Sequence, residues 1–370
     1  MSKDNVKIAV IGLGNISNMH LKNIAKAEGV DLAAVCDMDV EKAKKVAGEH
    51  DCRWYDDYKK LLAERVCDAV MITTPHYSHT YIGIDSLKAG CHVLVEKPIS
   101  VHKADCERLI AAHTDKNLVF AAMFNQRTDP KYKMARELIS SGRLGEIVRV
   151  NWVITDWFRT EKYYSGGSWR ATWKGEGGGV LLNQCPHQLD MLQWLCGMPE
   201  KVRGFCHFGR RHNIEVEDEV TAYMEFANGA TGVFIASTGE GPGSNMLEIC
   251  GDNGKIVMEG NRVEFFENAI SSSEHCKSSE DGFGGPSLKE PMCVYKFSGA
   301  GGQHFEVLQN FIDAIISGEK LIAPAEEGIN SVELANAMIY SSLEERVISL
   351  PLDAGAYEAK LMELIERSDR

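Results

Sequence analysis

The sequence predicts an α/β protein, with a doubly wound parallel sheet followed by an α+β domain whose large sheet is mostly antiparallel and open-faced. Three observations support this prediction: the length of the chain, the continuous apolar runs near its start, and the alternating runs further along. The chain has 370 residues, which exceeds one ordinary core of roughly 100 to 200 residues. Two domains are therefore expected.

Short apolar runs alternate with helical patterns before residue 128. Continuous apolar runs are typical of parallel strands that are buried on both faces. The expected strands are KIAVIG, DLAAVCD, DAVMIT, HVLVEKP and LVFAAMFN, and the expected helices are 16–28, 40–50, 78–89 and 103–116. This order predicts a doubly wound domain over 1–127.

After the sequence SGRLGE the apolar residues alternate, which predicts antiparallel strands with one solvated face. Hairpin signals stand at Asn228-Gly229 and Asn253-Gly254. The expected strands are EIVRVNWVI, KVRGFCHF, VTAYMEFANGATGVFIAS, NMLEICG, KIVMEG and RVEFFE; a long loop is expected at 271–302, and helices at 304–317 and 326–347. The second domain is expected over 128–350 and a helical tail over 351–370.

Composition excludes several classes of protein. The formal net charge of −13 opposes binding to nucleic acid, which depends on clustered cations. No apolar stretch reaches about 18 residues, so no membrane span is predicted. The 11 cysteines form no CxxC pair, and no histidine lies at finger-like spacing to them, so we assign no metal and expect reduced thiols in the cytoplasm.

The first strand ends in a glycine-rich turn that is typical of a Rossmann domain. Gly12, Gly14 and Ser17 form G-x-G-x-x-S before a helix, where a pyrophosphate can approach the backbone. Asp37 ends the second strand, where its carboxylate can accept both ribose hydroxyls of NAD and repel the 2′-phosphate of NADP. An alternative is that Asp37 caps the next helix.

A second group of candidate residues follows the third and fourth expected strands, DAVMIT and HVLVEKP. Lys97 ends a buried strand at the sheet edge where ligands bind in this topology. Burial beside a positively charged nicotinamide would lower the pKa of Lys97, so that it can act as a general acid or base. The alternative is a strand-end lysine that extends to solvent. The full set of expected NAD contacts is Gly12, Gly14, Asn15, Ile16, Asp37, Thr74, Pro75, His79, Glu96 and Lys97.

The segment GEGGGVLLNQCPHQLD carries polar residues within an apolar helical pattern. Its three glycines, 177–179, allow close backbone approach, and Asn183 and His187 are four residues apart, which predicts one helix face. Asp190 is expected to orient the imidazole or to cap the helix start. The alternative for His187 is a histidine satisfied within the core.

Aromatic and arginine side chains are interleaved just before this segment. Four of the six tryptophans lie between residues 152 and 173. Aromatic faces flanked by hydrogen-bonding groups suit the C–H face and hydroxyl rim of a sugar, and an oligomer interface would favour the same residue types. The expected substrate contacts are Arg159, Tyr163, Trp169, Arg170, Asn183 and His187.

GLGNIS with Asp37, TTPHYSHT, AGCHVLVEKP and GGGVLLNQCPHQLD together resemble the Gfo/Idh/MocA oxidoreductases over nearly the whole chain. The resemblance implies that Lys97 and His187 are a catalytic pair acting with NAD. It also implies a homodimer or homotetramer that pairs through the open face of the second sheet. Members that act on inositol usually have Asp where this chain has Asn183, and an amide cannot exchange protons. Proton transfer is therefore expected from Lys97 or His187.

The function expected from these residues is hydride transfer between NAD and a secondary hydroxyl of a sugar, glycoside or cyclitol. The stretch WRATWKGEGGGVLLNQCPHQLD is also similar to the family branch that oxidises the C3 hydroxyl of glucosides, which includes C-glycoside 3-oxidases. One alternative is a redox glycosidase that retains NAD and cleaves by oxidation and elimination. Another is a non-catalytic NAD-binding regulator.

Overall fold

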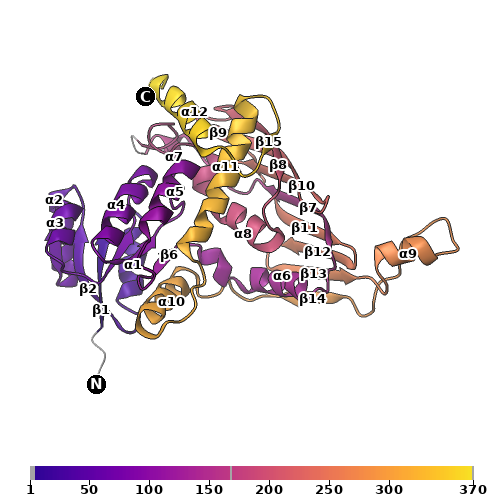
Figure 1. Cartoon of the computed structure of the whole chain (residues 1–370), viewed down its shortest axis with the longest axis horizontal. Coiled ribbons are helices and arrows are strands. Elements are labelled where there is room, and N and C mark those ends of the chain that lie inside the picture. The colour runs from indigo at the N-terminus through magenta and orange to yellow at the C-terminus, as the bar shows by residue number, and fades with distance from the viewer. Residues whose placement is uncertain (1–4, 167–168, 369–370) are drawn as a thin grey trace. The chain divides into compact units, whose positions relative to one another are not determined.

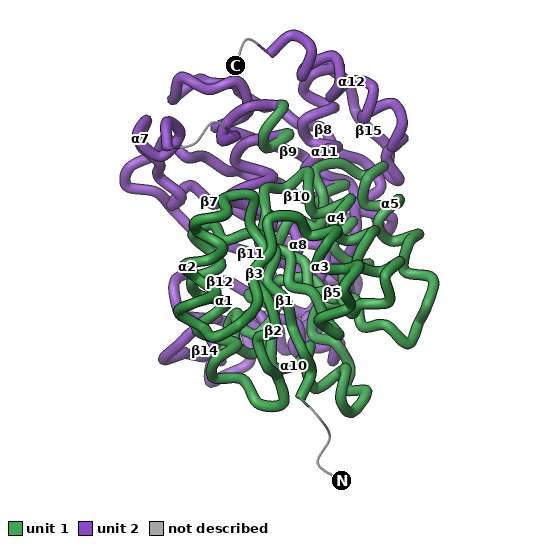
Figure 2. Tube along the Cα trace, turned by 90° about the vertical axis from the view of Figure 1, so that its left-hand side faces the viewer, with its two compact units in different colours: residues 1–128, 174–177, 302–333 green, residues 129–173, 178–301, 334–370 purple. Residues whose placement is uncertain are grey.

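In a computed structural model, which describes residues 5–166 and 169–368, the chain folds into two compact units (Figure 2). Unit 1 comprises residues 1–128, 174–177 and 302–333, and unit 2 comprises 129–173, 178–301 and 334–370. The expected domains were continuous, whereas here two later segments join the first unit. Within the described residues, every helix is too short or too polar to span a bilayer.

Unit 1 contains a six-stranded parallel sheet in the order β3-β2-β1-β4-β5-β6, which confirms the predicted doubly wound fold. Its strands are β1 (Val6–Ile11), β2 (Val30–Cys36), β3 (Arg53–Tyr55), β4 (Ala69–Ile72), β5 (His92–Val95) and β6 (Phe120–Ala122). Its helices are α1 (Ser17–Ile24), α2 (Val40–His50), α3 (Tyr58–Ala63), α4 (His76–Lys88), α5 (Lys103–Ala112) and α10 (Gln303–Ser317), with 3₁₀ turns at Asn125–Thr128 and Ala325–Glu327. The sequence patterns missed β3 and α3, because both are too short to show a clear period.

Helix α10 joins unit 1 because its apolar face completes the core of the parallel sheet. Val307, Leu308 and Phe311 are buried in one cluster with Ile8 and Val10 of β1. Burying such side chains stabilises the fold by about 1.5 to 3 kcal/mol each. A helix distant in sequence therefore belongs to the N-terminal sheet.

Unit 2 contains a nine-stranded mixed sheet in the order β14-β13-β12-β11-β7-β10-β9-β8-β15. All neighbouring strands are antiparallel except β10 and β7, which are parallel. The strands are β7 (Ile147–Ile154), β8 (Lys201–Phe208), β9 (Glu217–Glu225), β10 (Thr231–Ser237), β11 (Asn245–Gly251), β12 (Gly254–Glu259), β13 (Arg262–Glu267), β14 (Cys293–Lys296) and β15 (Ile348–Ser349). The predicted antiparallel sheet is confirmed, with a parallel pair at its centre.

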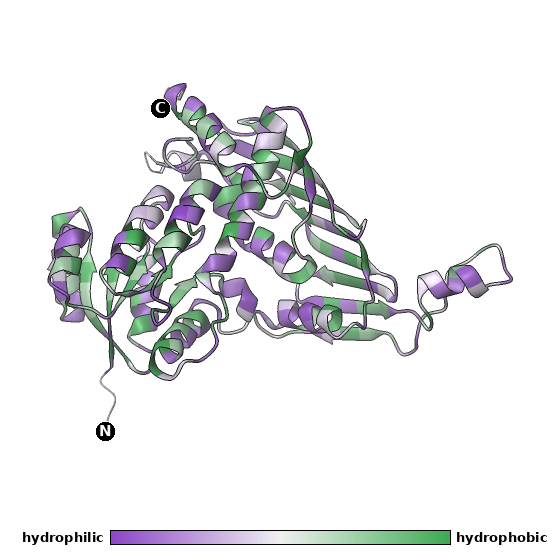
Figure 3. Ribbon diagram, in the orientation of Figure 1, coloured by the Kyte–Doolittle hydropathy of each residue, from purple (hydrophilic) through white to green (hydrophobic). Residues whose placement is uncertain are grey.

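The helices of unit 2 are α6 (Pro130–Ser140), α7 (Glu161–Tyr164), α8 (Pro186–Cys196), α9 (Ser272–Ser278) and α12 (Ala354–Glu366), and α11 (Gly328–Leu343) begins in unit 1 and ends in unit 2 (Figure 1). The loop expected over 271–302 was wrong in part, because this segment contains α9 and the edge strand β14. Buried and partly exposed residues alternate along the strands, so one face of the sheet is covered and the other is open. Hydrophobic and hydrophilic residues alternate along the same strands (Figure 3).

Candidate functional site

Close packing at Gly12 and a hydrogen bond to one carboxylate fix the conformation of the glycine-rich turn after β1. Gly12 has φ +96°, and a Cβ there would lie 2.7 Å from Thr74 Cγ2, so only glycine fits. A Cβ at Gly14 would meet no atom within 4 Å, which leaves its backbone accessible at the N-terminus of α1. Asp37 Oδ2 accepts the Leu13 N–H at 2.7 Å. The helix cap considered for Asp37 belongs instead to Asp39, which accepts the Lys42 N–H at 3.1 Å.

His79 connects the loops that follow β4 and β5. Its Nε2 lies 2.7 Å from the Thr74 carbonyl oxygen and its Nδ1 lies 2.8 Å from the Pro98 carbonyl oxygen. The ring is 1 % exposed, and burial lowers its pKa. Both nitrogens are thus occupied by the backbone, and the structure gives His79 the role of fixing the two loops expected to contact NAD. Pro75, at the N-cap of α4, lies in the first of these loops.

Lys97 follows a buried carboxylate at the carboxyl end of β5. Glu96 Oε2 accepts the Lys97 backbone N–H at 3.1 Å, and Glu96 Oε1 lies 2.6 Å from His20 Nε2 on α1. The His304 ring of α10 lies 5.7 Å from the His20 ring. Although burial opposes ionisation of Glu96, the His20 hydrogen bond and the nearby cations lower its pKa to about 2. The ionised Glu96 therefore fixes the backbone that carries Lys97.

Asn183 and His187 do not share one continuous α-helix, which corrects the prediction. Asn183 lies in a π-helical turn, Val180–Gln184, and His187 lies in the first turn of α8. The Cys185 N–H donates to the Val180 carbonyl oxygen at 2.8 Å, which gives the wider turn. Pro186 has no N–H to continue an α-helical pattern. The wider turn therefore changes the one-face geometry expected for four-residue spacing.

Glu217 of β9 holds the start of this turn. Its Oε1 accepts the N–H groups of Gly179 and Leu181 at 2.8 and 3.0 Å. A Cβ at Gly179 would lie 2.0 Å from the Glu217 carbonyl oxygen, so the close backbone approach predicted for the glycine run is present. Asp190 is fully buried and accepts a hydrogen bond from Gln193 Nε2 at 3.0 Å.

Arg159, Trp169, Arg170 and Asn183, four of the expected substrate residues, gather around a fifth, Tyr163. The guanidinium carbons of Arg159 and Arg170 lie 5.0 and 4.7 Å from the Tyr163 ring centre, and Arg170 also lies 4.6 Å from the Trp169 ring centre. The Tyr163 hydroxyl accepts a hydrogen bond from Arg170 at 2.7 Å and donates to Asn183 Oδ1 at 3.3 Å. The aromatic and arginine side chains are therefore joined to Asn183 by a direct hydrogen bond.

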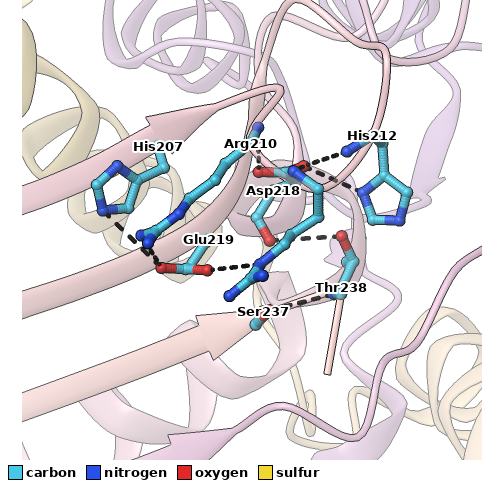
Figure 4. Close-up of polar contacts among 9 residues, drawn as sticks. His207, Arg210, His212, Asp218, Glu219, Ser237 and Thr238 are labelled. Carbon is cyan, nitrogen blue, oxygen red and sulfur yellow. Dashed lines mark hydrogen bonds and ion pairs between the residues drawn. The ribbon is translucent and has the colours of Figure 1, made fainter. Parts of the chain in front are cut away.

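A buried carboxylate that the sequence analysis missed supports this cluster (Figure 4). Asp218 of β9 is fully buried and accepts the backbone N–H groups of Arg210, Arg211 and His212 at 3.1, 2.7 and 3.0 Å. The His212 ring places Nδ1 3.1 Å from Asp218 and Nε2 3.0 Å from the Arg159 carbonyl oxygen. Asp218 therefore fixes the backbone of Arg159 through one histidine.

His20, His304, Glu217 and Asp218 were not identified from the sequence. Only His20 left a usable signal, since it lies on the helix that directly follows the glycine-rich turn. The partners of the other three are distant in sequence, so no local pattern indicates their roles.

Comparison with known proteins finds two family matches along the chain. Residues 6–124 match the model of the oxidoreductase family with an NAD-binding Rossmann fold, and residues 132–257 match the GFO/IDH/MocA C-terminal domain. These adjacent matches together span well over half of the chain. The chain belongs to the Gfo/Idh/MocA oxidoreductase family. The proposed resemblance is confirmed at this level, and unit 1 is the NAD-binding domain.

Similar members of the Gfo/Idh/MocA family include levoglucosan dehydrogenase of Pseudarthrobacter phenanthrenivorans, 25 % identical over 80 % of this chain and 83 % of that protein. Myo-inositol 2-dehydrogenase of Thermotoga maritima is 24 % identical over 93 % and 98 % of the two chains. Among solved structures, the WlbA dehydrogenase from Bordetella pertussis in complex with NADH and UDP-GlcNAcA has a TM-score of 0.81 and 24 % identity, covering 94 % of this chain and 100 % of that one.

The residues of the Gfo/Idh/MocA NAD-binding domain fit the dinucleotide. The open space at Gly14 and the helix start at Ser17 suit a pyrophosphate. Thr74 Oγ1 is buried without a hydrogen-bond partner within the described residues, so a polar ligand group can satisfy it. Asp37 retains lone pairs for ribose hydroxyls, which supports the role predicted for it.

Replacing Asp37 with alanine is expected to raise the Kd for NAD about 10- to 100-fold, because ribose loses charge-assisted hydrogen bonds and the glycine-rich turn loses the Leu13 contact. The Kd for NADP should rise less, so the preference for NAD over NADP should become smaller. Calorimetric titration of each dinucleotide measures both constants. Asp39→Ala is the control, since it removes only the cap of α2. If the Asp37 variant keeps the same preference for NAD over NADP, Asp37 does not bind the ribose hydroxyls.

Acid is expected to destabilise unit 1 in two steps. Burial lowers the pKa values of His79 and His304 below 6.5, so the unfolded chain binds more protons and the free energy of unfolding decreases as pH falls through 6.5. Glu96 has a pKa near 2 rather than 4.5, so a further loss of up to about 3 kcal/mol follows below pH 4.5. Urea unfolding from pH 7 to pH 3 measures both steps. Glu96→Gln should abolish the second step and enlarge the first, because the Glu96 charge raises the pKa values of both histidines.

Proposed function

We propose that this protein oxidises a secondary hydroxyl of a sugar, glycoside or cyclitol with NAD, or reduces the corresponding ketone. The observation that supports it most directly is the hydrogen bond between Tyr163 and Asn183, because it joins an aromatic surface suited to a sugar to the segment expected to carry chemistry. Levoglucosan and inositol dehydrogenases, by their names, act on compounds of this class. The C3 hydroxyl of a glycoside is the position that we propose.

NAD, when bound, supplies the hydride acceptor at its nicotinamide. In the proposed mechanism, Lys97 Nζ takes the proton of the reacting hydroxyl and returns it in the reverse direction. His187 holds the reacting oxygen or relays this proton, and Asn183 fixes a neighbouring hydroxyl. Glu96 keeps the Lys97 backbone in place through its carboxylate. Orienting the substrate in this way supplies several kcal/mol of barrier reduction.

A screen of monosaccharides, disaccharides and glycosides tests the proposal by following the absorbance of reduced nicotinamide. Reduction that depends on added NAD is the expected result, and Asn183→Ala should raise KM more than it lowers kcat. Release of nitrophenol from a nitrophenyl glycoside without added NAD would show the redox glycosidase reaction instead. Intact NAD binding with neither sugar-dependent NAD reduction nor nitrophenol release would contradict both enzymes.

We also propose that the open face of the nine-stranded sheet pairs two copies of the chain. Phe205, Tyr223 and Met246 lie on this face and are 52, 39 and 40 % exposed. An exposed apolar surface of this kind is typical of an interface. Sedimentation equilibrium at micromolar concentration should give a dimer or tetramer, and Phe205→Glu should weaken it. Met362→Glu on α12, where the side chain is 40 % exposed and lies outside the sheet, is the matched control. A monomer in the unaltered protein would contradict the proposal.

A further inference from the structure

One guanidinium in the aromatic cluster of unit 2, that of Arg159, lacks an ionic partner among the described residues. Arg159 forms no ion pair with any carboxylate in the described part of the chain, and its Nε is buried without a hydrogen-bond partner. Its guanidinium donates only to the Phe158 carbonyl oxygen and lies near the rings of Trp157 and Tyr163. A buried donor without an acceptor is costly, so an external acceptor would stabilise this side chain.

Three carboxylates of the same part of unit 2, Glu161, Asp218 and Glu215, accept other donors. Glu161 accepts the Asn213 N–H at 3.0 Å, and Asp218 accepts three backbone N–H groups. Glu215 accepts the Trp173 N–H at 3.4 Å and the Ser368 hydroxyl at 2.7 Å. The local carboxylates are therefore engaged elsewhere, although the chain as a whole carries a charge of −13.

A second guanidinium lies on the same tyrosine ring. Arg170 donates to the Tyr163 hydroxyl at 2.7 Å, and that hydroxyl also accepts from Gln184 Nε2 at 3.2 Å and donates to Asn183 at 3.3 Å. Two accepted bonds and one donated bond satisfy the phenol. The two arginines thus lie around Tyr163, and the Tyr163 hydroxyl links Arg170 to Asn183.

We propose that the substrate is an anionic sugar, whose carboxylate or phosphate is bound by Arg159 and Arg170 while Asn183 holds a hydroxyl of the same molecule. Guanidinium groups bind such oxygens through paired N–H donors. The anion supplies the acceptor that the buried Nε of Arg159 lacks. This inference rests on the proposed function, since it names the class of sugar that enters the site.

Calorimetric titration of the NAD-loaded protein tests this inference without requiring turnover. The probes are D-glucuronate, D-galacturonate and D-glucose 6-phosphate, each compared with neutral D-glucose or D-galactose. At least one anionic sugar is expected to bind about tenfold more tightly than its neutral counterpart, and added salt should reduce the difference. Preference for the uronates identifies a carboxylate, and preference for glucose 6-phosphate identifies a phosphate.

Arginine variants separate specific binding from general charge. Arg159→Gln and Arg170→Gln should each reduce the preference about tenfold, whereas Arg159→Lys and Arg170→Lys should retain part of it. Arg210→Gln is the matched control, because Arg210 is ion-paired with Glu219 and should leave the preference unchanged. Thermal unfolding of each variant verifies that it folds.

Two results overturn the inference. The first is that neutral sugars bind as tightly as the anionic ones. The second is that the preference for anionic sugars survives in the variant that carries both Arg159→Gln and Arg170→Gln. Either result would show that the arginines have another role. Anion-selective binding without NAD reduction would instead contradict the proposed function and leave the inference standing. If only neutral sugars reduce NAD, the inference is contradicted and the proposed function stands.

Discussion

Replacing Lys97 with methionine is expected to lower kcat about 1000-fold, because methionine keeps the aliphatic stem but cannot exchange the substrate proton. The Kd for NAD should change by less than about threefold, since the backbone contact between Lys97 and Glu96 does not require the ammonium group. Single-turnover reduction of NAD with the best sugar from the screen measures the rate, and calorimetry measures the Kd.

The control for Lys97 is Lys45→Met on the outer side of α2, where the lysine side chain is 76 % exposed; its activity should equal that of the unaltered protein. The double variant of Lys97→Met and His187→Ala distinguishes the two proton roles. If the residues act as a unit, the double variant should be little slower than the slower single variant. A Lys97→Met protein that keeps a tenth of its activity would assign proton transfer to another group.

Replacing Asp218 with alanine is expected to lower the free energy of unfolding by about 4 kcal/mol. The reason is that three backbone N–H groups and the His212 ring lose their shared acceptor in a fully buried place. Urea unfolding measures this change. Because His212 also contacts the Arg159 carbonyl oxygen, KM for the substrate should rise in any variant that still folds.

Glu219→Gln provides the comparison for Asp218, since it alters the neighbouring carboxylate that contacts Arg210 and Arg211 (Figure 4). Both arginines are about half exposed, so this change should cost less than about 1 kcal/mol. Asp218→Asn keeps the side-chain shape and one carbonyl oxygen. Its loss in the free energy of unfolding should lie between those of Asp218→Ala and Glu219→Gln. Equal losses for Asp218→Ala and Glu219→Gln would contradict the role of Asp218.

The nucleotide end of the protein was predictable in detail because its signals are local. The glycine-rich turn, the helix after it and Asp37 follow one another along the chain, and each residue type has a direct conformational or charge requirement. The same holds for β5, which ends at Val95, two residues before Lys97. The turn at Asn183 was predicted less accurately, because hydrogen bonds from Gly179 and Leu181 to Glu217 on a distant strand shape it.

The sequence alone determined the two-domain α/β architecture, the dinucleotide turn and the residue types of the candidate site, because apolar periodicity and turn chemistry act over a few neighbouring residues. Only the tertiary structure decided that α10 completes the first core, that His20 anchors Glu96, and that Asp218 holds Arg159 in place through His212. Each of these depends on burial and hydrogen bonding between residues far apart along the chain, and such contacts exist only once the sheets have formed.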